Sequence, residues 1–297
     1  MYPRAFRYHR AGSLKEAATM LAQLGDSAKL LAGGQSLIPL MKLRFANPAH
    51  LVDLNFIPRT SYIKEDNGAV RFGALSRHAE IEASAVAGKI PILHDCAAGI
   101  ADVQVRNRGT IGGSLAEADP SGDWATVLST LSTEVRCFGS NGERAVNLAE
   151  FIKDAYTTAL SHDELVSEIV VKLPPKGSGG AYLAFKRSAP VYPTASAAVQ
   201  LTMDGDACRD AAIALGCVGL TPIRAKDAEA ALHGQPVTDK TMTRVMEAAR
   251  SAADPQSDIR GSVDYKRTLV GALVKRAIDI AIRRARGEQV EVGHIYA

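Results

Sequence analysis

The sequence has 297 residues, of which 46% are hydrophobic and 23% are charged, and its mean hydropathy is near zero. This length and composition are typical of a folded globular protein with about two domains or three small ones, and they exclude an intrinsically disordered chain. The 35 basic residues are interspersed with 32 acidic ones, which leaves a formal net charge of +3. A charge this small and this evenly spread argues against a nucleic-acid-binding protein.

The sequence contains no pattern that would build a metal centre or a membrane anchor. The four cysteines are far apart and lack CxxC spacing, and the seven histidines form neither an HExxH nor an HxH motif. Because local zinc and iron–sulfur sites need closely spaced ligands, we expect reduced thiols and no metal. No run approaches the roughly 18 apolar residues of a membrane span, and no signal peptide is recognisable, so we expect a cytoplasmic protein without a transmembrane segment.

Apolar periodicity predicts the following elements in chain order. Helices are expected over residues 13–24, 78–86, 92–100, 123–131, 223–232, 238–253 and 264–286, with a helical turn at 39–44 and a short helix from 148. Strands are expected over residues 29–32, 50–54, 62–65, 69–72, 135–138, 144–147, 168–173, 182–186, 195–203 and 208–216. Ser13 and Glu16 form a capping box at the first helix, and two Asn-Gly pairs mark hairpins. The fold class predicted from these elements is α+β.

Two changes in composition predict the domain organisation. The pattern changes from helix and strand to hairpins near residues 55–60, and the Pro/Gly-rich segment 174–180 is the best linker in the sequence. The expected divisions are residues 1–57, 58–176 and 177–297. The last is expected to hold a three-stranded antiparallel sheet followed by a three-helix bundle.

Two glycine-rich loops carry the strongest functional signal. Residues 32–36 (AGGQS) and 109–114 (GTIGGS) each place paired glycines beside polar side chains. Without Cβ atoms in the way, backbone N–H groups can approach a ligand closely, and this arrangement favours anions. Each loop alone is more often an ordinary tight turn. Together, the two loops can hold two linked phosphates.

The better-known phosphate and catalytic motifs are absent. The dinucleotide fingerprint GxGxxG, the nucleotide loop GxxxxGK[ST] and the nucleophile elbow GxSxG do not occur at either loop. Asp119 and Asp123 follow the second loop, and two interpretations of them stay open. They could be a turn residue and a helix N-cap, or one carboxylate could accept hydrogen bonds from ligand hydroxyls such as those of a ribityl chain.

Residues 30–44 (LLAGGQSLIPLMKLR) and 106–114 (RNRGTIGGS) closely resemble the FAD-binding medium subunit of molybdenum hydroxylases. That family includes carbon monoxide dehydrogenase, nicotine dehydrogenase and xanthine dehydrogenase-type enzymes. Residues 258–267 (DIRGSVDYKR) resemble the family's C-terminal signature, so the similarity runs along essentially the whole chain.

The resemblance implies a two-part FAD-binding fold of the vanillyl-alcohol-oxidase type, followed by a smaller α+β domain. It also implies an oxidoreductase assembled from several subunits. A molybdenum-cofactor large subunit would oxidise the substrate, a [2Fe-2S] small subunit would carry the electrons, and FAD on this chain would pass them to an external acceptor. The expected assembly is a heterohexamer with two copies of each subunit.

The resemblance further implies a set of cofactor-binding residues. The two loops matching those that wrap the FAD diphosphate comprise Leu30, Leu31, Ala32, Gly33, Gly34, Gln35, Ser36 and Leu37, and Thr110, Ile111, Gly112, Gly113 and Ser114. Asp123 matches a ribityl-contacting acid, and Lys186 falls near the polar edge of the isoalloxazine, where a cation would stabilise the reduced ring. Tyr192 matches an aromatic residue that covers the flavin, and Ile169 a residue packed near it.

Two features of the sequence differ from those of some members of the family. Two other functions also remain open. Residues 188–193 (SAPVYP) differ from the Gly-Asp loop common in the family, and the cysteine-bearing insertion that holds an extra cluster is missing. A self-sufficient flavin oxidase would need a base beside the flavin, for which the sequence offers no clear candidate. An assembly subunit without flavin would leave the paired glycines of both loops unexplained.

Overall fold

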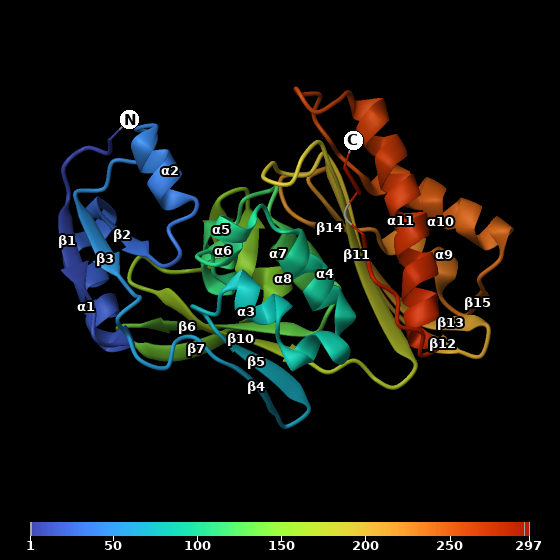
Figure 1. Ribbon diagram of the computed structural model, residues 1–297, viewed down its shortest axis with the longest axis horizontal. Coiled ribbons are helices and arrows are strands. Elements are labelled where there is room, and N and C mark those ends of the chain that lie inside the picture. Colours follow the sequence, from blue (N-terminus) through green and yellow to red (C-terminus); the bar gives the residue numbers. More distant parts are fainter. Residues whose placement is uncertain (1, 294, 297) are drawn as a thin grey trace.

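The computed structural model describes residues 2–293 and 295–296, and its three larger sheets are arranged in chain order along the long axis (Figure 1). A small N-terminal sheet lies at one end and a C-terminal sheet with its helices lies at the other. A five-stranded sheet and a group of short helices lie between them. Among the described residues, no helix combines the length and apolarity needed to cross a bilayer.

The N-terminal sheet is parallel, with strand order β1-β3-β2. Its elements are β1 (Arg7–Arg10), α1 (Leu14–Leu24), β2 (Ala28–Leu31), α2 (Leu37–Lys42) and β3 (His50–Asp53). Half of the predicted capping box forms: Ser13 Oγ accepts from Glu16 N at 3.1 Å, but the Glu16 carboxylate accepts from Gly12 N at 2.7 Å and not from the N-cap amide of Ser13. Strand β1 was not predicted, because its four largely exposed residues show no alternation of apolar and polar side chains.

The central sheet is antiparallel, with strand order β4-β5-β10-β6-β7. Its strands are β4 (Ile63–Asp66), β5 (Ala69–Gly73), β6 (Thr133–Gly139), β7 (Gly142–Asn147) and β10 (Leu165–Lys172), and β8 (Ile152–Asp154) pairs with β9 (Thr157–Thr158). Both Asn-Gly hairpins form as predicted. The helices are α3 (His78–Glu82), α4 (Pro91–Gly99), α5 (Val103–Arg106), α6 (Ile111–Glu117), α7 (Asp123–Leu128) and α8 (Leu148–Phe151).

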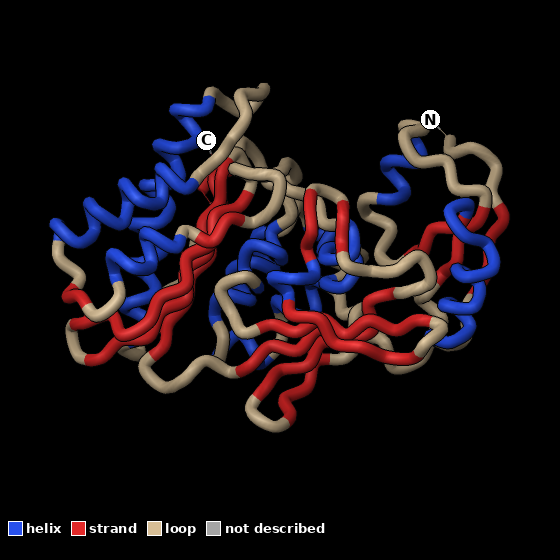
Figure 2. Tube along the Cα trace, turned by 180° about the vertical axis from the view of Figure 1, so that it is seen from behind, coloured by secondary structure: helices blue, strands red, loops and turns tan. Residues whose placement is uncertain are grey.

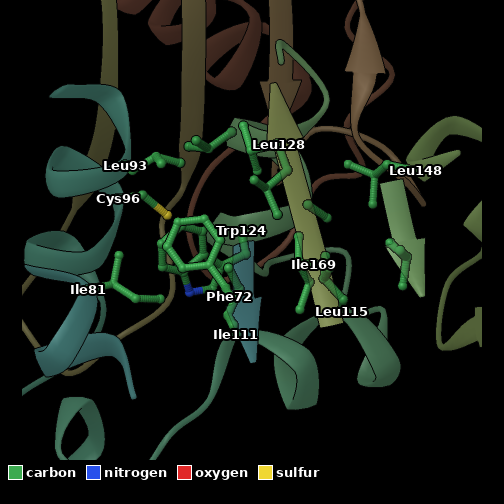
Figure 3. Close-up of a cluster of buried hydrophobic side chains, with 14 of the residues drawn as sticks. Phe72, Ile81, Leu93, Cys96, Ile111, Leu115, Trp124, Leu128, Leu148 and Ile169 are labelled. Carbon is green, nitrogen blue, oxygen red and sulfur yellow. The ribbon is translucent and has the colours of Figure 1, made fainter. Parts of the chain in front are cut away.

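These short helices cover the central sheet and bury its largest side chains. Trp124 and Phe72 are fully buried and pack with residues of α4, α6 and β10 (Figure 3). Ile111 and Ile169 lie in the same core, and neither is accessible to solvent. The two residues therefore contribute to the packing behind the loops.

The C-terminal sheet is larger than the predicted three strands. The long strands β11 (Ser178–Lys186), β12 (Ala195–Asp204) and β13 (Ala207–Gly216) are antiparallel as expected. Three two-residue strands extend them: β14 (Ile223–Arg224), β15 (Gln235–Pro236) and β16 (Ile295–Tyr296). Such short strands carry no periodicity of their own, so only their pairing with the long strands reveals them.

The predicted three-helix bundle is instead a layer on one face of this sheet (Figure 2). The three helices are α9 (Lys226–Leu232), α10 (Asp239–Ala252) and α11 (Val263–Ala285). Helix α11 packs on β11 and β12, α9 packs on β13, and α10 contacts both helices. The opposite face of the sheet contacts α4 and α7, so the C-terminal part is packed directly against the central part.

The predicted linker ends earlier than expected, because β11 begins at Ser178 and includes Gly179 and Gly180. A Cβ at Gly179 would lie 2.0 Å from the carbonyl oxygen of Ala281 in α11, so the helix can approach the strand only where the side chain is absent. Arg284 of α11 forms a buried ion pair with Asp95 of α4 at 2.6 Å and donates to Gly180 O at 2.7 Å. This charge pair fastens the last helix to the central part of the molecule.

Candidate functional site

A cavity of about 630 Å³ lies where the three parts of the chain meet. Its lining includes Leu30, Ala32, Gly33, Gly34, Gln35, Ser36 and Leu37, together with Thr110, Gly112, Gly113, Ser114, Asp123, Lys186 and Tyr192. Three of the predicted site residues are outside this lining: Leu31, Ile111 and Ile169. The volume falls within the range of small-molecule and cofactor sites.

The two glycine-rich loops meet backbone to backbone at this cavity. A Cβ built on Gly33 would lie 2.3 Å from the carbonyl oxygen of Arg108 and 2.8 Å from the Cα of Gly109. A Cβ on Gly112 would lie 2.7 Å from the carbonyl oxygen of Ala74. Glycine is needed at both positions because the main chains approach too closely for any side chain.

The first loop supplies free main-chain donors. The first amide that bonds back into the turn is Ile38 N, which donates to Gly34 O at 3.1 Å. Within the described part of the chain, the N–H groups of residues 33–37 have no hydrogen-bond partner. Consecutive unpaired amides facing a cavity form a binding site for an anion.

The second loop differs from the expectation of a second amide cradle. The amide of Ile111 donates to Ser76 O at 3.1 Å, that of Gly112 to Ala74 O at 3.0 Å, and that of Gly113 to Thr110 Oγ1 at 3.1 Å. The first amides of α6 are therefore already used. This loop contributes the hydroxyls of Thr110 and Ser114 and allows close approach at its glycines.

Asp123 and Lys186 are buried residues of the lining. Gly122 is the N-cap of α7, so Asp123 is the first helical residue and the N-cap interpretation of Asp123 is wrong. Tyr182 Oη donates to Asp123 Oδ1 at 2.5 Å, and Lys186 Nζ donates to Gly99 O at 2.5 Å. Burial raises the pKa of Asp123, opposed by the nearby charge of Lys186 and by the Tyr182 hydrogen bond.

Asp119 agrees with the interpretation that it is a turn residue. Its Oδ1 accepts from Ser121 N at 2.8 Å, which is an Asx-turn between α6 and α7. Asp119 also lines the cavity, next to Glu117. The hydroxyl of Ser36 donates to the Glu117 carboxylate and so joins the first loop to α6. Glu117 was not predicted, because a single acid near the end of a helix carries no signal.

His78 is a site residue that sequence reasoning missed. It lines the cavity, and its Nδ1 accepts from Trp124 Nε1 at 3.0 Å. Burial, followed by the positive charges of Arg77 and Arg106, lowers the pKa of His78 to about 3. The imidazole is therefore neutral and carries its proton on Nε2. A Cβ on Gly109 would lie 2.6 Å from this Nε2, so His78 supports the second loop from behind.

Tyr192 lies in the loop between β11 and β12 and is 44% exposed at the cavity. Its ring lies 5.9 Å from the guanidinium carbon of Arg260, which belongs to the C-terminal signature. Burial, followed by the negative charges of Asp119 and Glu117, raises the pKa of Tyr192. Tyr156 also lines the cavity and was not predicted, and burial raises its pKa as well. The phenols therefore stay neutral hydrogen-bond donors near neutral pH.

The described residues contain no group of three histidine, cysteine or acidic side chains placed to hold a metal ion. The four cysteines are free thiols. The polar groups of the lining include unpaired amides, hydroxyls, the carboxylates of Glu117, Asp119 and Asp123, the imidazole of His78 and the ammonium of Lys186. Such groups can form hydrogen bonds with the phosphates and hydroxyls of an extended ligand.

Comparisons with known proteins identify the class of ligand. A family model described as the FAD binding domain in molybdopterin dehydrogenase matches residues 4–174, and one described as the CO dehydrogenase flavoprotein C-terminal domain matches residues 180–281. The chain is 39% identical to the carbon monoxide dehydrogenase medium chain of Afipia carboxidovorans, covering 96% of this chain and 100% of that one. It is 36% identical to the 6-hydroxypseudooxynicotine dehydrogenase complex subunit alpha of Paenarthrobacter nicotinovorans, covering 99% and 100%.

A solved structure shows the same arrangement. The carbon monoxide dehydrogenase of Hydrogenophaga pseudoflava contains a chain that matches with a TM-score of 0.93 and 40% identity, over 96% of this chain and 99% of that one. The fold and the cavity thus define a flavoprotein subunit of an oxidoreductase. The chain belongs to the family of FAD-binding medium subunits of the molybdenum hydroxylases.

The residues present fit FAD on structural grounds. The free amides of residues 33–37 and the hydroxyls of Thr110 and Ser114 suit a diphosphate, and the buried Asp123 and Lys186 lie elsewhere in the same lining. When bound, FAD supplies two-electron redox chemistry, while the protein supplies binding, orientation and electrostatics.

Proposed function

We propose that this chain serves a molybdenum hydroxylase as the subunit that takes electrons from iron–sulfur clusters on a partner and delivers them to an external acceptor. The meeting of the two glycine-rich loops at one cavity carries this proposal, together with a family similarity that spans the whole chain. Substrate oxidation belongs to a molybdenum-cofactor large subunit, and a [2Fe-2S] small subunit links the two. The proposed assembly is a heterohexamer with two copies of each subunit.

The proposed roles of the residues follow their places around the cavity. Residues 30–37 and 110–114 hold the diphosphate, with Leu31 and Ile111 acting through the main chain and the core. Asp123 accepts hydrogen bonds from the ribityl hydroxyls, and Lys186 places its charge beside the polar edge of the isoalloxazine. Tyr192 covers the ring from the loop between β11 and β12. Ile169 packs behind the site.

The proposed domain organisation keeps the divisions 1–57, 58–176 and 177–297. The first two correspond to the N-terminal and central sheets, and we assign them to the two parts of a flavin-binding fold of the vanillyl-alcohol-oxidase type. The third corresponds to the C-terminal sheet and its helical layer. Residues of all three line the cavity, which supports a ligand held between them.

The test is to purify the full chain alone and together with its partner subunits. We expect flavin bands near roughly 375 and 450 nm, and FAD rather than FMN after denaturation. Co-expression with the neighbouring genes should give a complex that contains molybdenum and iron. A colourless chain that takes up no FAD would overturn the flavoprotein assignment. A yellow chain that oxidises an organic substrate without partners would support the self-sufficient oxidase instead.

A further inference from the structure

Two polar residues outside the cavity connect the glycine-rich loops to each other. Asn55 follows β3, and Arg77 is the residue before α3. Neither belongs to the cavity lining, and both are half-buried. Their side chains nevertheless reach the main chain of both loops.

Asn55 holds the first loop. Its Nδ2 donates to Ala32 O at 2.8 Å and to Asp53 Oδ1 at 2.6 Å. Its main-chain N also donates to Asp53 Oδ1 at 2.8 Å. Leu31 O lies a further 3.5 Å from the same nitrogen, so the amide nitrogen faces acceptors only and the amide oxygen must face a donor; it accepts from Arg77 Nη2. The orientation of the Asn55 side chain is therefore set by its partners on both sides of the amide.

Arg77 holds the second loop. Its Nη1 donates to the carbonyl oxygen of Arg108, while its Nη2 donates to Asn55 Oδ1. The oxygen of Arg108 is the atom that a Cβ on Gly33 would approach to 2.3 Å. A planar guanidinium can serve two acceptors at once in a fixed geometry, which an ammonium cannot.

These contacts form a closed ring. It runs from Ala32 O through Asn55 and Arg77 to Arg108 O, and then across the close contact with Gly33 back to Ala32. We propose that Arg77 and Asn55 act as a clamp that holds the two loops together as one diphosphate-binding cradle. Both are positioning residues, since they act through main-chain carbonyls. The inference rests on the proposed binding of the FAD diphosphate by these loops.

The test measures FAD binding to the full chain after removal of its flavin. Arg77→Met keeps much of the side-chain length but removes every donor, and Asn55→Ala removes the amide. Each variant loses a hydrogen bond that involves the charged guanidinium. Loss of such a bond should weaken FAD affinity by about 10- to 100-fold. Because the two residues act in one ring, the double variant should bind within about twofold of the weaker single variant.

A matched control separates this role from general destabilisation. Arg224 also bonds one main-chain oxygen, Ser129 O at 2.9 Å, and one side-chain acceptor on Glu229 at 2.7 Å, but it lies outside the cavity lining. Arg224→Ala should keep FAD affinity within about twofold of wild type. At saturating FAD, the ³¹P resonances of the bound diphosphate should shift in the Arg77 and Asn55 variants and stay unchanged in the Arg224 variant.

The remaining outcomes are also decisive. If Arg77→Met fails to fold, Arg77→Lys replaces it. An intermediate loss of FAD affinity in Arg77→Lys supports the clamp, and wild-type affinity contradicts it. Single variants that bind FAD as tightly as Arg224→Ala, or losses that multiply in the double variant, overturn the clamp. A wild-type chain that binds no FAD overturns the proposed function itself, which distinguishes the two failures.

Discussion

The phenol of Tyr182 donates a hydrogen bond to Oδ1 of Asp123 across 2.5 Å, and both side chains are buried. Tyr182 lies in the C-terminal sheet and Asp123 begins a helix of the central part, 59 residues earlier. The bond therefore joins two parts of the molecule at the cavity. It also occupies one carboxylate oxygen of Asp123 and so orients the carboxylate that faces the cavity.

Tyr182→Phe should change the pH dependence of FAD binding. Burial raises the pKa of Asp123, and the Tyr182 hydrogen bond opposes this effect, so its loss should raise the pKa further. If the ionised carboxylate accepts the ribityl hydroxyls, affinity is lost as the pH falls through this pKa. The loss should then begin at a higher pH in the variant. Fluorescence titrations of FAD binding over a series of pH values measure it.

Tyr62→Phe is the matched control for this experiment. Tyr62 also donates to a buried carboxylate, that of Glu168, but neither residue lines the cavity. Its removal should leave the pH profile of FAD binding unchanged. Identical profiles for wild type and Tyr182→Phe would contradict the role assigned to this bond.

Lys186→Met should lower the reduction potential of the bound flavin. Lys186 is 3% exposed, and at its proposed place beside the ring its charge would stabilise the negative charge gained on reduction. Loss of an interaction of about 1–3 kcal/mol corresponds to about 20–60 mV for a two-electron couple. Redox titration followed at the flavin bands measures the shift. Lys266→Met is the control, since Lys266 is equally buried but pairs with Asp258 away from the cavity lining. Equal flavin potentials in the two variants would argue against the role assigned to Lys186.

Gly33→Ala should weaken FAD binding by about 10- to 100-fold, because overpacking typically costs about 1–3 kcal/mol. The new Cβ would lie 2.3 Å from Arg108 O, so the two loops would have to separate. Equilibrium dialysis or flavin fluorescence measures the change. Gly88→Ala tests the same substitution where no atom lies within 4 Å of the added Cβ, and it should bind FAD normally. Unchanged affinity in Gly33→Ala would show that loop contact is unnecessary.

His78→Gln should reduce the loss of stability in acid. The pKa of His78 is lowered to about 3, against about 6.5 in an unfolded chain, so the unfolded state binds the extra proton between these values. Stability is complete above about pH 6.5 and falls by up to about 1.4 kcal/mol per pH unit towards pH 3. Glutamine keeps an acceptor for Trp124 but does not titrate. Urea unfolding at a series of pH values measures the slope.

The exposed His162 provides the comparison for that series. His162→Gln should keep the steep acid dependence of the wild type, because it leaves His78 in place. A His78→Gln protein as acid-sensitive as the wild type would show that other groups cause the loss.

The sequence by itself determined those features that depend on residues close together in the chain. The Ser13 N-cap, the hairpins and the three long strands of the C-terminal sheet all follow from patterns a few residues wide. The glycine-rich loops were recognisable for the same reason, since paired glycines beside polar residues limit what a short stretch can do. The resemblance to the family was recognisable from those same local motifs.

Only the tertiary structure decided which groups meet. Asp123 lies beside Tyr182, His78 beneath Gly109, and Arg108 O against Gly33, and each contact joins residues that are far apart in the sequence. The tertiary structure also pairs the first amides of the second loop, because Ala74 and Ser76 supply acceptors for them. Local patterns record which face of an element is buried, but the packing of the three sheets selects the partner of each donor and acceptor.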